Sequence, residues 1–172
     1  TLASFNNNTV SLIMTIEKLI TLAKKKPKNS RWLGVDLGSK TLGLAITDPS
    51  LIIATPLKTL PRTKFSKDLP NLQKVITEHT VSSFIFGLPT NMNGEEGRRA
   101  QATRDFVSNL SIHIRLPVVF WDERLSTAAV QRLMIDEANL SRQKRAGSVD
   151  KMAAAFILQG ALDALKNHIS ER

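Results

Sequence analysis

The fold is decided by residues 31–47, RWLGVDLGSKTLGLAIT. Residues 32–37 are nearly all apolar, which is typical of a strand buried on both faces. A turn at residues 38–40 follows, and residues 42–47 predict an antiparallel return strand. The stretch therefore predicts a β-hairpin that carries an aspartate, Asp36, inside its first strand.

Outward from this hairpin, the sequence predicts strands that alternate with helices. Further strands are expected at 52–60, 84–86 and 117–121, helices at 66–79, 95–110, 126–138 and 150–168, and a basic irregular segment at 141–147. A hairpin followed by crossover strands predicts a three-layer α/β fold: a mixed sheet, led by an antiparallel hairpin, with helices on both faces. We expect this domain to span residues 31–172, behind an N-terminal extension of residues 1–30.

The composition favours a polyanionic partner. The 172 residues include 24 Lys and Arg against 15 Asp and Glu, a formal net charge of +9, and a positive field attracts nucleic acid. The chain has no cysteine, which excludes disulfides and thiolate metal sites. No apolar run approaches the roughly 20 residues that span a bilayer, so we expect no membrane partner.

The N-terminal extension has helical spacing at residues 10–22, followed by a basic linker. A secretory signal has the opposite order, with charge before the apolar stretch. Two interpretations stay open: an amphipathic helix packed on the domain, or the remnant of an organelle-targeting region. We expect a cytoplasmic protein, or a plastid or mitochondrial one if the extension follows a transit peptide.

Carboxylates stand at three edges of the expected elements. Asp36 lies within an apolar strand, where an unpaired charge costs several kcal/mol; Asp122 and Glu123 follow a strand, and Asp150 opens the last expected helix. A structural salt bridge or a turn-capping role before Gly38 would also explain Asp36, and helix-dipole compensation would also explain the others. Clustered carboxylates suit hard ions such as Mg²⁺ or Mn²⁺, and a pair of these can promote phosphodiester cleavage.

Other catalytic chemistries find little support in the sequence. His79, His113 and His168 are scattered and lack metal-ligand spacing. No Walker-type loop is present, and the serines and threonines of the hairpin have no partner motif of a serine hydrolase.

Four segments in order resemble the YqgF/RuvX family: GVDLGSKTLGLA (34–45), FGLPTNMNGEEG (86–97), DERLST (122–127) and VDKMAA (149–154). Each is weak alone, but their order and spacing match from about residue 31 to 163. The resemblance implies a ribonuclease H-like fold related to Holliday-junction resolvases. It also implies a metal-dependent endonuclease that matures the small-subunit (16S-type) ribosomal RNA precursor.

By position, the resemblance implies that Asp36, Glu123 and Asp150 are the catalytic acids and hold Mg²⁺ or Mn²⁺. Asp122 stays the alternative to Glu123, because neighbouring strand residues face opposite sides and one of the two should point at the metal. Glu123 is preferred for its longer reach.

Basic residues within or beside the motifs are expected to bind nucleic-acid phosphates. They are Lys40, Arg98, Arg124, Arg142, Lys144 and Arg145. The expected partner is the RNA precursor, with structured DNA as the alternative, bound by a monomer or a homodimer.

Three other functions compete with this interpretation. A junction-resolving DNA nuclease would share the fold and the metal chemistry. An ATP-using protein of the actin or hexokinase type has a similar first hairpin, but it needs two such domains. A non-catalytic RNA-binding ribosome factor would not need all three acids.

Overall fold

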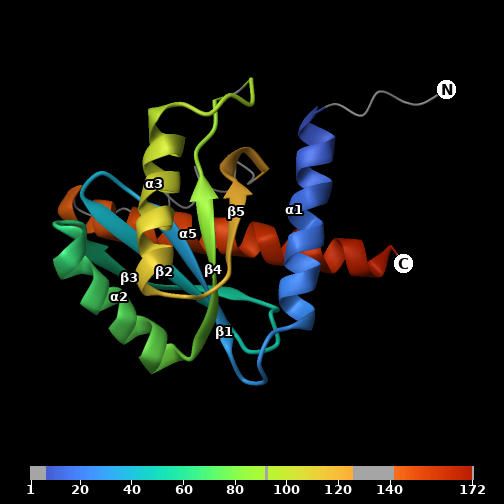
Figure 1. Cartoon of the computed structure of the whole chain (residues 1–172), viewed down its shortest axis with the longest axis horizontal. Helices are drawn as coiled ribbons and strands as arrows, with labels where there is room; N and C mark the ends of the chain where they lie inside the picture. The colour runs from blue at the N-terminus through green and yellow to red at the C-terminus, as the bar shows by residue number, and fades with distance from the viewer. Residues whose placement is uncertain (1–6, 92, 126–141, 172) are drawn as a thin grey trace.

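The computed structural model describes residues 7–91, 93–125 and 142–171 (Figure 1). The helices are α1 (Asn7–Lys24), α2 (Phe65–His79), α3 (Arg98–His113) and α5 (Arg142–Ser170), with a 3-10 turn, η1, at Glu123–Leu125. The strands are β1 (Arg31–Leu37), β2 (Thr41–Thr47), β3 (Ala54–Pro61), β4 (Val81–Leu88) and β5 (Val118–Asp122).

The strands form a single mixed sheet in the order β3-β2-β1-β4-β5. β1, β2 and β3 pair antiparallel, whereas β4 is parallel to β1 and β5 is parallel to β4. Figure 1 shows α2 and α3 in front of the sheet and α5 crossing behind it. The three-layer α/β fold with a leading hairpin is therefore confirmed.

Side-chain alternation along the strands divides the core into two clusters. On β1, Leu33 and Val35 join the cluster with α2 and α3, whereas Trp32 joins the cluster with α5. A Cβ on Gly34 would lie 2.8 Å from Leu158 Cβ on α5. Because Asp36 has the same parity as Trp32 and Gly34, it belongs to the face covered by α5.

Helix α1 packs against the same domain. Its Leu19 is fully buried in the cluster that contains Trp32 and, from α5, Leu162. Residues 10–22 thus lie in a helix that packs on the domain. The division of the chain at residue 30 stays a prediction. None of the described helices is long and apolar enough to cross a membrane.

Several element boundaries before residue 113 were predicted wrongly; β4, for example, spans Val81–Leu88 rather than residues 84–86. β3 begins at Ala54 rather than residue 52, because the Asp48 carboxylate accepts the N–H groups of Ile52 (2.7 Å) and Ile53 (2.9 Å) and closes a turn there. α3 begins at Arg98 rather than residue 95, with no acidic residue in its first turn. A turn around Gly94, at a φ of 87°, holds the chain before the helix.

The last helix was also placed wrongly. α5 begins at Arg142, so the backbone from residue 142 to 147 is helical rather than irregular. Asp150 lies well inside the helix, which removes helix-dipole compensation as its explanation. A single helical glycine costs only about 1 kcal/mol, so Gly147 did not mark a boundary. The helix predicted at 126–138 lies outside the described residues.

Candidate functional site

Asp36 sits at the carboxyl end of β1, half-buried under α5. Its cross-strand partner on β2 is Gly43, and on the other side β1 pairs with β4 through Val35 and Phe86. The residue after Phe86 is Gly87, and a Cβ built on Gly87 would point toward α5. Asp36 is thus flanked on both neighbouring strands by glycines on its own face of the sheet.

Because Gly43 has no side chain, the backbone of Asp150 can approach β2 closely. A Cβ on Gly43 would overlap the carbonyl group of Asp150 and lie 3.0 Å from the backbone nitrogen of Lys151. The backbone of α5 therefore rests directly on β2 beside Asp36. The hydroxyl of Thr41, one strand position along that face, donates a hydrogen bond to the Asp150 carboxylate and orients it.

Because Gly87 has no side chain, the side chain of Glu123 can approach β4 closely. A Cβ on Gly87 would lie 2.8 Å from Glu123 Oε1, so the carboxylate occupies the space that a side chain would fill. Trp121 of β5 joins the cluster under α5, and Glu123 follows this strand as the first residue of η1. Asp36, Glu123 and Asp150, called the carboxylate site below, are brought together from β1, η1 and α5.

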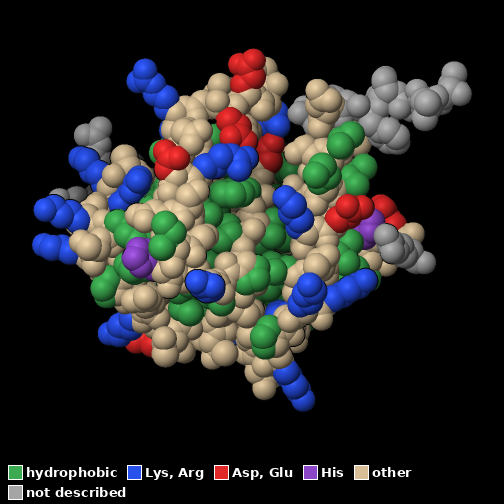
Figure 2. All heavy atoms as spheres, viewed as in Figure 1, with side chains coloured by type: hydrophobic (Ala, Val, Ile, Leu, Met, Phe, Trp, Pro, Cys, Tyr) green, Lys and Arg blue, Asp and Glu red, His purple; other side chains and the backbone are tan. Residues whose placement is uncertain are grey.

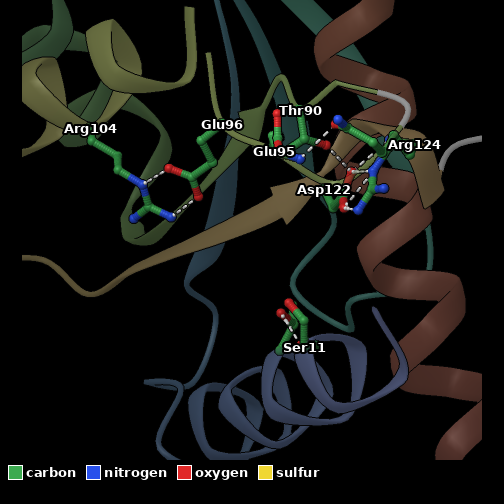
Figure 3. Close-up of polar contacts among 9 residues, drawn as sticks. Ser11, Thr90, Glu95, Glu96, Arg104, Asp122 and Arg124 are labelled. Carbon is green, nitrogen blue, oxygen red and sulfur yellow. Dashed lines mark hydrogen bonds and ion pairs between the residues drawn. The ribbon is translucent and has the colours of Figure 1, made fainter. Parts of the chain in front are cut away.

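Asp122 has different partners. Its carboxylate accepts hydrogen bonds from the Thr90 hydroxyl (2.9 Å), the Arg124 backbone (2.9 Å) and the Arg124 guanidinium (2.5 Å) (Figure 3). Burial opposes the charge on Asp122, but these donors outweigh it and lower its pKa. Asp122 thereby fixes the start of η1, and Arg124, expected to bind phosphate, is held in an ion pair.

The electrostatics single out Asp36. Burial, and then the like charges of Glu123 and Asp150, raise its pKa from 3.8 to about 7, against the opposing field of Arg99. Burial also raises the pKa of Glu123, where Arg99 again opposes the shift and Asp122 adds to it. These shifts describe a buried negative cluster that lacks enough positive charge.

Arg99 is a site residue that the sequence prediction missed. It lies in the first turn of α3 and is the cation whose field acts on both Asp36 and Glu123. Arg99 and its neighbour Arg98, the residue predicted instead, are both exposed, but only Arg99 influences the pKa of Asp36 and of Glu123. The available signal was the GRR sequence at the helix start, but choosing between adjacent arginines required the orientation of the helix.

The turn between β1 and β2 is tethered by a second missed arginine. Arg62, directly after β3, donates from Nη1 to the carbonyl of Gly38 (2.8 Å), and its backbone N–H donates to the carbonyl of Lys40 (2.8 Å). The guanidinium also lies over the Phe106 ring. Lys40 itself is exposed on this turn, at the same end of the sheet as the carboxylate site.

The other predicted phosphate-binding residues stand at the start of α5. The backbone there is helical at Arg142, Lys144 and Arg145, while their side chains lie outside the described part of the structure. Their role stays a prediction.

The donor set fits a hard divalent cation. It consists of carboxylate oxygens, which Mg²⁺ and Mn²⁺ prefer, and the repulsion that raises the pKa of Asp36 would be relieved by a bound cation. Within the described residues, no three acidic or histidine side chains form a group that could already hold a metal ion. The structure therefore gives a carboxylate cluster of suitable chemistry, and the ion itself belongs to the proposal below.

The raised pKa of Asp36 predicts a pH-dependent stability in the absence of divalent ions. The folded state holds this proton up to about pH 7, whereas the unfolded chain releases it near pH 4. The free energy of unfolding should therefore fall as the pH rises between these values. Asp36→Asn should remove this loss, making the variant more stable than wild type at pH 8 by on the order of a few kcal/mol.

Urea denaturation at pH 5 and pH 8 in EDTA measures this difference. Added Mn²⁺ should then stabilise wild type, because only the folded protein binds the ion. The variant lacks the charge of Asp36 and should not be stabilised. Parallel stability profiles for the two proteins across this pH range would show that the pKa of Asp36 is not raised in the folded protein.

A three-layer α/β fold, with acids near the carboxyl end of the first strand of its sheet, is the arrangement of the ribonuclease H-like class. Among solved structures, the Thermus thermophilus RuvC structure superposes with a TM-score of 0.50 at 11% identity, over 81% of this chain and 96% of that chain, and supports the fold alone. The RuvX family, described as "Holliday junction resolvase", matches residues 30–164. The chain belongs to the RuvX family.

Similar sequences carry names of one kind. A protein of Rhodobacter capsulatus named "Putative pre-16S rRNA nuclease" is 54% identical over 139 residues, covering 81% of this chain and 87% of the relative. A protein of Phenylobacterium zucineum with the same name is 47% identical over 156 residues, covering 90% of this chain and 99% of the relative.

Proposed function

We propose that the protein is a metal-dependent endonuclease that cuts structured RNA, with the precursor of the small-subunit ribosomal RNA as its substrate. The observation that carries the proposal is the convergence of Asp36, Glu123 and Asp150 through the two glycine gaps at Gly43 and Gly87. The names of the relatives support the choice of substrate.

The carboxylate site would hold Mg²⁺ or Mn²⁺. When bound, such ions activate water and stabilise the leaving oxygen of a phosphodiester. The chain's own residues prepare this chemistry: Thr41 orients Asp150, the sheet fixes Asp36, and Asp122 fixes the turn that carries Glu123.

Substrate binding is assigned to the basic side chains around the carboxylate site. Lys40 projects from the β1–β2 turn and Arg99 from the first turn of α3, and cations at both sides of the acids would hold the phosphates that flank the scissile bond. The formal charge of +9 supports binding through the backbone of a nucleic acid.

A junction-resolving DNA nuclease is the second candidate function. The description of the matching family favours it, and the same acids would serve both substrates. The match to this family across one domain disfavours the two-domain ATP-using alternative. A non-catalytic RNA-binding factor would have no use for a buried acid whose charge is opposed by two other acids.

The test is cleavage of matched substrates in Mn²⁺ and in EDTA. We expect the precursor RNA to be cut only with the ion, and faster than a DNA duplex or a four-way DNA junction of equal length. Faster cutting of the junction would favour the resolvase. Intact substrates in every divalent ion, together with tight RNA binding, would favour the binding factor.

Arg99 gives a sharper prediction, because its neighbour Arg98 provides a matched control on the same helix. Arg99→Ala should lower the cleavage rate at saturating RNA by about 10- to 100-fold, since it removes the positive charge that lowers the pKa of Asp36 and of Glu123. Arg98→Ala, with the same loss of charge, should mainly weaken RNA binding. Single-turnover kinetics separate rate from affinity, and equal loss of rate in both variants would assign no special role to Arg99.

A further inference from the structure

A groove of about 890 Å³ lies at the end of the sheet opposite the carboxylate site. It runs between α1 and the beginnings of β4 and β5, where residues 80–83 and 116–119 line its wall. β1, β4 and β5 are parallel, and Asp36 and Glu123 lie at or just beyond the carboxyl ends of β1 and β5, so the amino ends that form this groove face away from that site. A ligand in the groove would therefore leave the acids accessible.

The groove combines an apolar floor with a basic rim. Leu22 of α1 and Leu116, Pro117 and Val118 beside the sheet edge supply apolar surface, and Figure 2 shows hydrophobic side chains gathered in the hollow between α3 and α1. Within the described part of α1, the apolar surface continues beyond the groove. Val10, Ile13 and Met14 are 44%, 45% and 54% exposed, and Met14 also lines the groove.

The charges at the rim are mostly positive. Lys18, Lys25 and Lys26 line the groove against a single acid, Glu17. Lys26 is held by the carbonyl of Ser30 (2.8 Å), whereas Lys18 and Lys25 are exposed. The ion pairs found among the described residues leave both of these lysines without an acidic partner.

From this geometry we propose that the groove between α1 and the β5 edge docks a short amphipathic helix of a partner protein, with acidic residues flanking its apolar face. An apolar face would cover the floor and Met14, and acidic residues would meet Lys18 and Lys25, as in other helix-in-groove complexes. Charge complementarity selects the partner, because an apolar segment with basic flanks would bring like charges together. A nucleic acid would leave the apolar floor unmatched.

The probe is a fluorescent synthetic peptide of about 15 residues, long enough to form a helix, with leucines on one face and glutamates on the other. A second peptide carries lysines in place of the glutamates. Fluorescence anisotropy should show the acidic peptide binding wild type at least about tenfold more tightly than the basic one. Met14→Gln should weaken this binding, because it removes exposed apolar surface without touching the buried core.

Charge reversal at the rim provides the matched comparison. Lys18→Glu with Lys25→Glu should abolish the preference for the acidic peptide, whereas Lys67→Glu with Lys166→Glu changes the net charge equally at exposed positions outside the groove lining and should keep it. RNA cleavage should be equal in the two double variants.

Three results would overturn the proposal. They are no binding of the acidic peptide up to about 1 mM, equal effects of the two double reversals on peptide affinity, and a larger loss of RNA binding from the rim reversal than from its control. The last result would make the groove an RNA surface. Peptide binding is measured on the intact protein and does not depend on RNA cleavage. Failure of the docking proposal is therefore distinguishable from failure of the proposed function.

Discussion

Replacing Asp36 by asparagine is expected to abolish metal-dependent cleavage while leaving RNA binding intact. The substitution keeps the shape of the side chain but removes the charge at the centre of the carboxylate site. Loss of residues that merely support metal ligands costs 10- to 100-fold, so the cleavage rate should fall by at least about 100-fold. RNA affinity should stay near that of wild type, or rise slightly, because the basic residues carry binding and one repulsive charge is gone.

Asp163→Asn is the matched control for this experiment. Asp163 is an exposed residue near the other end of α5, where its carboxylate accepts a hydrogen bond from Gln159 (2.9 Å). It should cleave like wild type. A thermal melt confirms that each variant folds, and a folded Asp36→Asn protein that cleaves as fast as wild type would remove Asp36 from the mechanism.

Replacing Gly43 by alanine should have the largest effect on stability. Its Cβ would overlap the Asp150 carbonyl group, and backbone atoms cannot swing aside as a side chain does. Overpacking costs typically 1–3 kcal/mol and occasionally more; here we expect about 3 kcal/mol, or a fall in Tm of about 6–12 °C. Because α5 must move away from β2, the variant should also lose cleavage.

Gly97→Ala is the comparison for Gly43→Ala. A Cβ on Gly97 would meet its nearest heavy atom, on Asn91, at 3.7 Å, an ordinary contact, and the backbone φ of −94° suits any residue. This variant should lose less than about 1 kcal/mol. Equal losses in urea denaturation of the two variants would show that α5 does not rest on Gly43 as described.

The sequence was sufficient to predict the layers of the fold and the position of Asp36 within the first strand. An apolar strand that contains Asp36, followed by a turn and a second apolar strand, has few other interpretations. The choice of Glu123 over Asp122 was made from side-chain length. The structure favours Glu123 for a different reason: its carboxylate lies beside Gly87, whereas Asp122 is engaged by Arg124 and Thr90.

The remaining features depend on tertiary packing. Asp150 was predicted at a helix start, because residues 141–147 were interpreted as a basic irregular segment, but α5 begins at Arg142. The two glycines that admit the acids, Gly43 and Gly87, have no distinctive sequence signal, since only the opposing elements show why a side chain is excluded. Arg99 was missed for the same reason.

Calorimetric titration of Mn²⁺ tests whether Asp36, Glu123 and Asp150 form one cation site. If they do, Glu123→Gln and Asp150→Asn should each weaken Mn²⁺ binding by at least about tenfold. Asp122→Asn, which changes the neighbouring carboxylate by the same chemistry, should weaken it far less. An equal or larger loss from Asp122→Asn, or Mn²⁺ binding unaffected by the Glu123 and Asp150 variants, would contradict the account.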